Sequence, residues 1–208
     1  MWRFAYAGVH RVLYWPFALN GDILDTAGDW ICDALRSLGL TAQVTTWTSL
    51  EGRDADELEA FDLLHVGGGN TFRLLDHIQR HAFVAPVRAF VELGGRYYGG
   101  SAGAIIACED IGIAAPYDPN NVGLTNLNGL ALVPAYSVLP HFDDMVEPAL
   151  CWVREHQRPL LAVPERGGIR YGDETFTAIG PDSSTEITEL GPIPRPAGMS
   201  WIDRGRMH

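Results

Sequence analysis

Short apolar runs alternate with amphipathic segments of helical length through the first two thirds of the chain. The runs 11–18 and 62–66 have the length and the apolar content of buried strands. Between them, apolar residues recur at three- and four-residue spacing from Ile23 to Leu38, and Gly39 follows where a C-terminal cap belongs. Such alternation favours a mainly parallel sheet with helices on both faces. We therefore expect an α/β fold in a single three-layer domain.

The same patterns extend this interpretation along the chain. We expect further strands at 43–47, 96–99, 130–139 and 160–163, and helices from Asn70 or Thr71, at 86–93, from Ser101 and at 143–156. The residues up to about position 190 are typical of β-hairpin additions. Residues 191–208 are rich in Pro, Gly and Arg. We expect them to form an extended or poorly ordered tail beyond a domain of residues 1–190.

Charge and cysteine content limit the class of protein. The chain has 15 basic and 26 acidic side chains, a formal net charge of −11, which disfavours nucleic acid and anionic membranes as partners. Its three cysteines, Cys32, Cys108 and Cys151, form no close pair and predict neither a disulfide framework nor a zinc site. No apolar stretch approaches about 20 residues, and no signal-peptide pattern opens the sequence. We therefore expect a cytoplasmic protein without a membrane span.

Four unusual segments follow predicted strands. They are Gly67–Asn70, Gly99–Gly103, Pro140-His141 and Pro164-Glu165. In open α/β sheets, sites form at the carboxyl ends of the strands. These segments are therefore expected to meet at one site.

Ser101 stands in the segment Gly99-Gly100-Ser101-Ala102-Gly103, which has the form of a nucleophile elbow. On such a turn the hydroxyl projects into a cleft, and the backbone N–H of Ala102 can stabilise an oxyanion. The alternative is a serine that caps a helix after a glycine turn. The glycine run at 67–69 offers a second oxyanion donor, for which Gly69 is the candidate; the alternative interpretation of the run is a tight strand–helix turn.

A serine nucleophile needs a base. Among the seven histidines, His141 follows a proline at a predicted strand end, whereas His65 lies inside a buried strand and is interpreted as a core residue. Glu165 also follows a proline at a strand end and could orient the imidazole. Together these residues predict a Ser101–His141–Glu165 triad.

The sequence resembles the peptidase E family, the aspartyl dipeptidases, which belong to a larger group that includes cyanophycinase. The matching segments are Leu13–Ala18, Val66–Phe72, Gly100–Ala104, Val122–Thr125, Pro140–Phe142 and Pro164-Glu165. The resemblance implies a triad of Ser101, His141 and Glu165, with oxyanion donors on the backbone of Gly69 and Ala102. It also implies a fold like that of the class I glutamine amidotransferases with Ser in place of Cys, no metal or cofactor, and a homodimer.

Three features depart from the family pattern. The family's usual first strand is shortened or replaced by residues 1–10, and Arg166 stands where a glycine usually follows the catalytic acid. The Arg that follows the family's catalytic His and grips the aspartyl side chain has no counterpart in residues 142–147, which are acidic. Arg154 is the nearest basic residue. Strict Asp specificity is therefore not expected.

We expect a serine peptidase that cleaves short peptides near a free N-terminus, as a dipeptidase or aminopeptidase does. Asn70, Asp118 and Arg154 are candidate substrate-binding residues, with Asp118 an option for the free amino group or a simple turn residue. Two alternatives remain: a carboxylesterase-type serine hydrolase, and a non-catalytic binding module on the same scaffold. The esterase is less favoured because such enzymes place the acid before the His in chain order.

Overall fold

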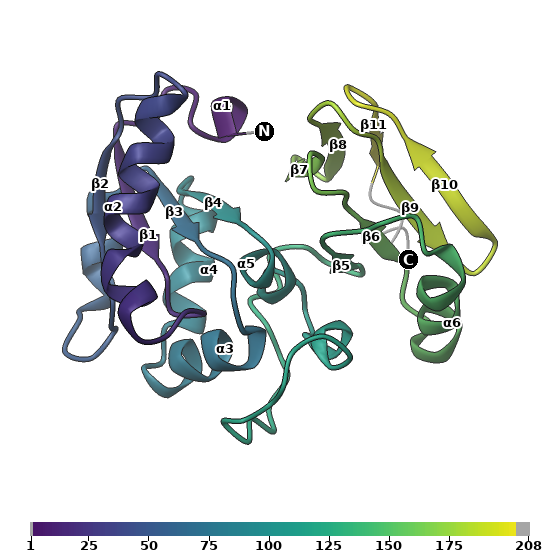
Figure 1. Cartoon of the computed structure of the whole chain (residues 1–208), viewed down its shortest axis with the longest axis horizontal. Helices are drawn as coiled ribbons and strands as arrows, with labels where there is room; N and C mark the ends of the chain where they lie inside the picture. Colours follow the sequence, from purple (N-terminus) through teal and green to yellow (C-terminus); the bar gives the residue numbers. More distant parts are fainter. Residues whose placement is uncertain (1, 203–208) are drawn as a thin grey trace.

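A four-stranded, wholly parallel sheet organises the N-terminal half of the molecule (Figure 1). The computed structural model describes residues 2–202. The strands are β1 (Arg11–Trp15), β2 (Gln43–Thr46), β3 (Leu63–Val66) and β4 (Arg96–Gly99), in the order β2-β1-β3-β4. The expected α/β fold with a mainly parallel sheet is confirmed.

Helices cover both faces of this sheet because successive strand residues point to opposite sides. On one face, Val12 and Tyr14 of β1 contact the cluster formed with α1 (Trp2–Ala5) and α2 (Asp22–Ser37). On the other face, Leu13 and Trp15 join the larger core. That core is closed by α3 (Thr71–Arg80), α4 (Val84–Glu92), α5 (Ala102–Ile106) and the short 3-10 helices η1 (Ala55–Ala60) and η2 (Gly112–Ala114).

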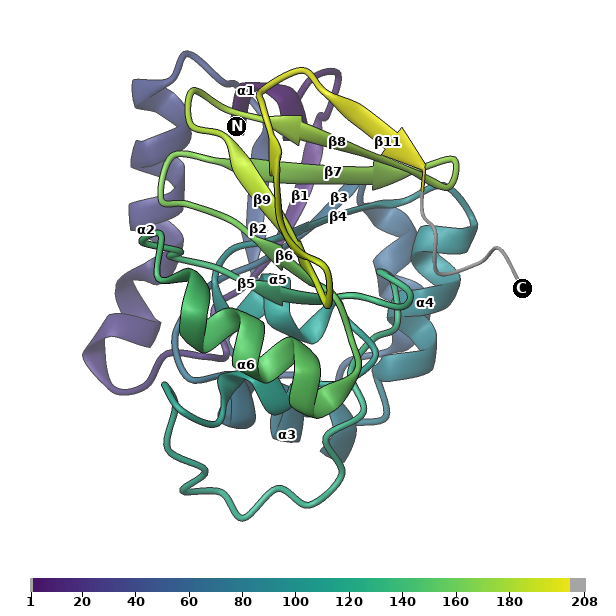
Figure 2. The same ribbon diagram turned by 90° about the vertical axis from the view of Figure 1, so that its right-hand side faces the viewer.

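The C-terminal half contains two further sheets, which face the viewer in Figure 2. One is mixed, in the order β10-β9-β6-β5, with β5 and β6 parallel and the other pairs antiparallel. Its elements are β5 (Ser137–Leu139), β6 (Leu160–Ala162), β9 (Ser184–Thr188), β10 (Gly191–Arg195) and the helix α6 (Val146–His156). The other is antiparallel, with β7 (Gly168–Gly172), β8 (Thr175–Ile179) and β11 (Ser200–Ile202).

The strand expected over residues 130–139 is present only in its last three residues, as β5. The segment before it is held by loop contacts instead: the N–H of Leu130 donates to the carbonyl of Ile106, and Val133 forms an isolated bridge with Cys108. Because β5 does not pair with β4, the expected continuous sheet is divided into two.

Residues 191–202 differ from the expected tail, since they form β10 and β11 and belong to the sheets. Pro192 and Pro194 are tolerated in β10 because, among the strands of residues 2–202, it lies at a sheet edge and pairs only with β9. Arg195 is buried and forms an ion pair with the buried Glu186 of β9. This ion pair holds β10 in place together with the backbone hydrogen bonds between β10 and β9. Residues 203–208 lie outside the described part of the chain.

Among the described helices, none is long and apolar enough to cross a membrane.

Candidate active site

Ser101 sits at the sharp turn between β4 and α5. Its backbone has φ 50° and ψ −113°, a conformation that L-residues rarely adopt and that stores strain. Although it occupies the N-cap position of α5, its side chain makes no capping hydrogen bond. The alternative of a helix-capping serine is therefore not what the structure contains, and the hydroxyl is available for other contacts.

Two glycines let the strand and the helix approach closely enough to make this turn. A Cβ on Gly103 would lie 2.3 Å from the carbonyl oxygen of Val66, and one on Gly99 would lie 2.4 Å from that of Gly103. Both contacts are with backbone atoms, which cannot move aside as a side chain would. The turn that presents Ser101 thus requires glycine at both positions.

His141 and Glu165 come to Ser101 from the other side of the molecule. They follow β5 and β6, which are neighbouring parallel strands. Nε2 of His141 lies 2.9 Å from Oγ of Ser101, and Nδ1 lies 2.5 Å from Oε2 of Glu165. An ionised carboxylate only accepts, so Nδ1 carries the proton and donates it, which leaves the lone pair of Nε2 to accept from the Ser101 hydroxyl.

The glycine run after β3 forms the opposite edge of the site. A Cβ on Gly68 would lie 3.0 Å from Cβ and 3.6 Å from Oγ of Ser101, so this glycine faces the serine directly. Gly69 has φ 132°, and a Cβ there would lie 2.5 Å from the carbonyl oxygen of Ala18. The sequence pointed to Gly69 for its amide but did not single out Gly68. The glycine run was the sequence signal for this edge of the site, but only the packing shows which of its members faces Ser101.

Comparisons with known proteins identify the family of this chain. A model of peptidase family S51 matches residues 2–179. The chain belongs to peptidase family S51. Membership of this family places the chain among the peptidases, and the resemblance to peptidase E is confirmed.

Individual relatives of this S51 chain include named peptidases. Peptidase E of Actinobacillus pleuropneumoniae serotype 5b (strain L20) is 33% identical over 186 residues, which are 82% of this chain and 75% of that protein. The uncharacterized peptidase Lmo0363 of Listeria monocytogenes is 35% identical over 114 residues, and the chain covers only 55% of its length. The crystal structure of a candidate peptidase E protein from Listeria monocytogenes EGD-e superposes with a TM-score of 0.67 at 28% identity, covering 82% of this chain and 86% of that one.

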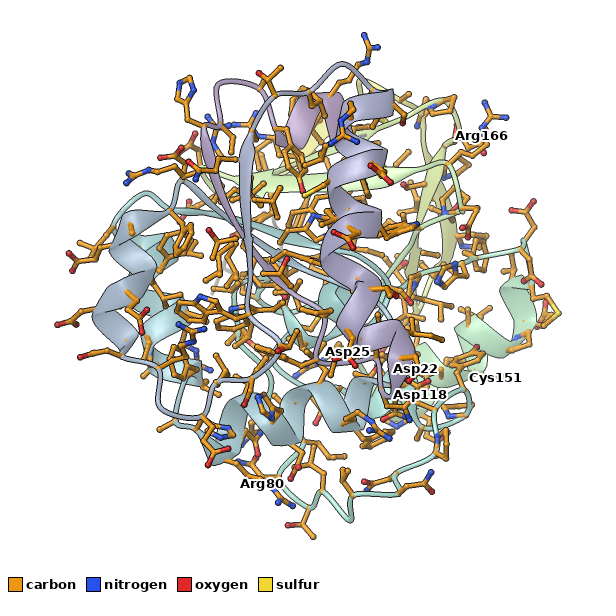
Figure 3. All side chains as sticks on the ribbon, turned by 60° about the vertical axis from the view of Figure 1, so that its left-hand side comes forward. Asp22, Asp25, Arg80, Asp118, Cys151 and Arg166 are labelled. Atoms are coloured by element: carbon orange, nitrogen blue, oxygen red, sulfur yellow. The ribbon has the colours of Figure 1, made fainter. Side chains whose placement is uncertain are left out.

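Asn70 and Asp118, two of the residues expected to bind substrate, hold the loop after η2 against α3. Asp118 is labelled in Figure 3. The amide of Asn70 accepts from the N–H of Arg73 and donates to the carbonyl of Pro119, each at 2.9 Å. Oδ2 of Asp118 accepts from the N–H of Thr71 at 2.8 Å. These contacts cap the N-terminus of α3, so both residues have a structural role in this arrangement.

Arg154 lies on the exposed surface of α6 and is not among the residues that line the cleft at Ser101. The structure therefore does not bring this third candidate to the site. Arg166 is also exposed, with an ion-pair distance of 3.9 Å to Asp182, and Figure 3 shows it at the periphery of the C-terminal half.

His65 is the centre of an aromatic cluster that adjoins the site. The hydroxyl of Tyr6 is hydrogen-bonded to Nδ1 of His65, and the rings of Tyr14 and Tyr98 have centroids 5.2 and 4.5 Å from its own. Burial lowers the pKa of His65 to about 3, so the ring is neutral near pH 7. His65 is buried and hydrogen-bonded to Tyr6, which agrees with its interpretation as a core residue rather than a catalytic base.

No group of three or more His, Cys, Asp or Glu side chains within residues 2–202 is placed to hold a metal ion.

Proposed function

We propose that this chain is a serine peptidase that hydrolyses short peptides near their free N-terminus, with Ser101, His141 and Glu165 as its triad. The observation that carries the proposal is the continuous hydrogen-bonded series from Ser101 Oγ through the His141 ring to Glu165. It joins a nucleophile on a strained turn to a base and the base to an orienting carboxylate, which is the arrangement such catalysis needs.

The chemistry follows from these contacts. Ser101 Oγ attacks the scissile carbonyl carbon while its proton passes to Nε2 of His141, and the C–O bond forms as the carbonyl oxygen becomes an oxyanion. The C–N bond then breaks, and His141 gives its proton to the leaving amine. A water molecule, deprotonated by His141, then attacks the acyl carbon; the bond from that carbon to Ser101 Oγ breaks, Oγ takes the proton back from His141, and the carboxylic acid product leaves. Glu165 stabilises the His141 imidazolium that forms during acylation and again during deacylation.

Backbone amides are the candidate oxyanion donors. Ala102 is the first residue of α5, and the N–H groups of the first turn of a helix have no partner within the helix. The peptide group between Gly68 and Gly69 is next to Ser101, because a Cβ added to Gly68 would lie 3.0 Å from Cβ of that residue. Donors at Ala102 and Gly69 would then approach the oxyanion from two sides.

Preference for the free N-terminus rests on the relationship to peptidase E, and strict Asp specificity is not part of the proposal. The segment after His141 carries Asp143, Asp144 and Glu147, all exposed. Arg154 does not reach the cleft, so no guanidinium from α6 is placed to hold an aspartyl side chain. A homodimer stays a prediction.

The esterase alternative is less well supported because the acid follows the base in the chain, at 165 after 141. A binding module without catalysis would have no need for the strained Ser101 turn or for its contact with His141.

A substrate panel tests the proposal. We expect hydrolysis of dipeptides and of short peptides with a free amine, and loss of that hydrolysis on N-terminal acetylation and in the Ser101→Ala protein. Activity confined to p-nitrophenyl esters would support the esterase instead. Equal hydrolysis of acetylated and free peptides would contradict the exopeptidase assignment while leaving a serine peptidase.

A further inference from the structure

A cleft of about 970 Å³ separates β4 from the walls formed by β5 and β7, and Ser101 and His141 are among its lining residues. This volume is at the upper end of the range of about 300–1,000 Å³ for ligand sites. It is more space than the two residues of a dipeptide need. The cleft extends along the whole of β4, from Ser101 to Arg96.

The wall on the β4 side is an open strand edge. Within residues 2–202, β4 is the last strand of its sheet and pairs only with β3. Arg96 and Gly100 donate their N–H groups towards β3, to the carbonyls of Asp62 and Val66. Since alternate residues of a parallel strand direct their amides to opposite sides, the N–H groups of Tyr97 and Gly99 point to the cleft. An open edge of this kind is a template for an added strand.

The far end of the cleft is cationic, although the chain has a net charge of −11. Apart from the triad residue Glu165, the charged side chains that line the cleft in the described residues are Arg96 and Arg170, both exposed. They come from opposite walls and meet the same N-terminal segment: Nη1 of Arg96 donates to the carbonyl of Ala7 at 2.6 Å, and the guanidinium of Arg170 lies 5.8 Å from the centroid of the Phe4 ring. A carboxylate at this end would find two guanidinium groups.

We propose that the cleft binds the part of the substrate on the C-terminal side of the cleaved bond, as an extended strand antiparallel to β4, with the peptide's C-terminal carboxylate at Arg96 and Arg170. This inference rests on the proposed function, because it takes Ser101 as the point of cleavage. The backbone from Ser101 to Arg96 spans roughly 16 Å at about 3.3 Å per residue. The preferred substrates are therefore peptides of about five to seven residues, rather than dipeptides.

Peptides of two to eight residues, each as the free acid and as the C-terminal amide, test this assignment. We expect kcat/KM to rise with length up to about six residues, and amidation of the hexapeptide to raise its KM about tenfold or more, as expected for loss of a hydrogen bond to a charged group. The double variant R96Q/R170Q should show the same higher KM for the free acid and no further effect of amidation. The matched control is R36Q, which changes an arginine that is exposed on α2 and pairs with Asp33.

Binding measured without turnover separates this site from the reaction. The Ser101→Ala protein should bind the free-acid hexapeptide more tightly than its amide by calorimetry, and the difference should vanish in R96Q/R170Q. If the peptide binds in a way that depends on Arg96 and Arg170 but the unmodified protein does not hydrolyse it, the carboxylate site is supported and the peptidase function is contradicted. Hydrolysis with no dependence on length or on the C-terminal carboxylate, or failure of the Ser101→Ala protein to bind the hexapeptide at millimolar concentration, would overturn the site.

Discussion

Oγ of Ser101 lies 2.9 Å from Nε2 of His141, although the two residues follow strands of different sheets and are 40 positions apart. Ser101 follows the last strand of the parallel sheet, and His141 follows the first strand of the mixed sheet. The hydrogen bond therefore spans the division between the two halves of the molecule. In the proposed mechanism, catalysis would depend on how these halves are held together, because a displacement of about 1 Å would break the contact.

Loss of charge at the third triad position should slow the reaction without preventing binding. In Glu165→Gln the side chain keeps its size but no longer compensates the imidazolium, so kcat should fall about 10²–10⁴-fold with KM nearly unchanged. Steady-state kinetics on one good peptide measures this. The neighbouring Arg166→Gln is the control and should retain nearly full activity. A Glu165→Gln enzyme with unchanged kcat would exclude Glu165 from the triad.

Gly68 is expected to be intolerant of a methyl group for steric reasons. A Cβ there would lie 3.0 Å from Cβ of Ser101, tighter than ordinary contact, and would displace the nucleophile. Gly68→Ala should lower kcat/KM about 100-fold, since small displacements of reacting groups cost about that much. Gly100→Ala is the matched control, because its nearest contact would be an ordinary 3.8 Å to Tyr98. Equal activity of the two variants would show that Gly68 does not position Ser101.

Two roles are possible for Asp118: it caps the N-terminus of α3, or it binds the free amine of the substrate. Asp118→Ala removes the acceptor of the Thr71 N–H, which should lower the free energy of unfolding by about 1 kcal/mol. Asp118→Asn keeps an acceptor oxygen and should lose less stability. Urea unfolding and KM for a free-amine peptide are measured on both. A raised KM in Asp118→Asn with unchanged stability would assign the residue to substrate binding.

Stability should decrease in acid because of His65. Its pKa is lowered to about 3 by burial in the folded protein and is about 6.5 in an unfolded chain. Between these values the unfolded state binds more protons, so the stabilisation present above pH 6.5 is lost as the pH falls towards 3. His65 should contribute a loss of about 2 kcal/mol between pH 7 and pH 5.

Urea unfolding of the native and His65→Gln proteins at the two pH values tests this, since the variant should lack that part of the pH dependence. The same slope in both proteins would contradict the neutral, buried His65.

The periodicity of the sequence predicted much of the first sheet and its helices. β3 and α2 combine strong apolar patterns with glycines at their ends, and the structure places both within one residue of the expected bounds. β1 begins at the expected residue, Arg11, but ends at Trp15, because Pro16 lacks the N–H that would continue the strand ladder. The strand ends at 99, 139 and 162 were also visible from their glycine and proline residues. The family and the fold class could thus be inferred before the structure was known.

Other features depend on how segments distant in the sequence pack together, which the local sequence pattern does not show. Pro192 and Pro194 argue against a central strand, but β10 is an edge strand, where the missing N–H groups cost little. The position of Arg154 on the exposed side of α6 depends on how that helix packs, and the close approach of Gly68 to Ser101 depends on where β3 lies beside β4. The division between β4 and β5 follows from the path of residues 107–136, which have little periodicity.

Covalent labelling of Ser101 tests the central claim most directly. A fluorophosphonate probe should form one adduct, located on Ser101 by peptide mass spectrometry, and no adduct should form in Ser101→Ala. Labelling in His141→Ala should be slower by about 100-fold or more, because the hydroxyl then lacks its base. Absence of labelling in the folded native protein, or a rate unchanged by His141→Ala, would contradict the triad.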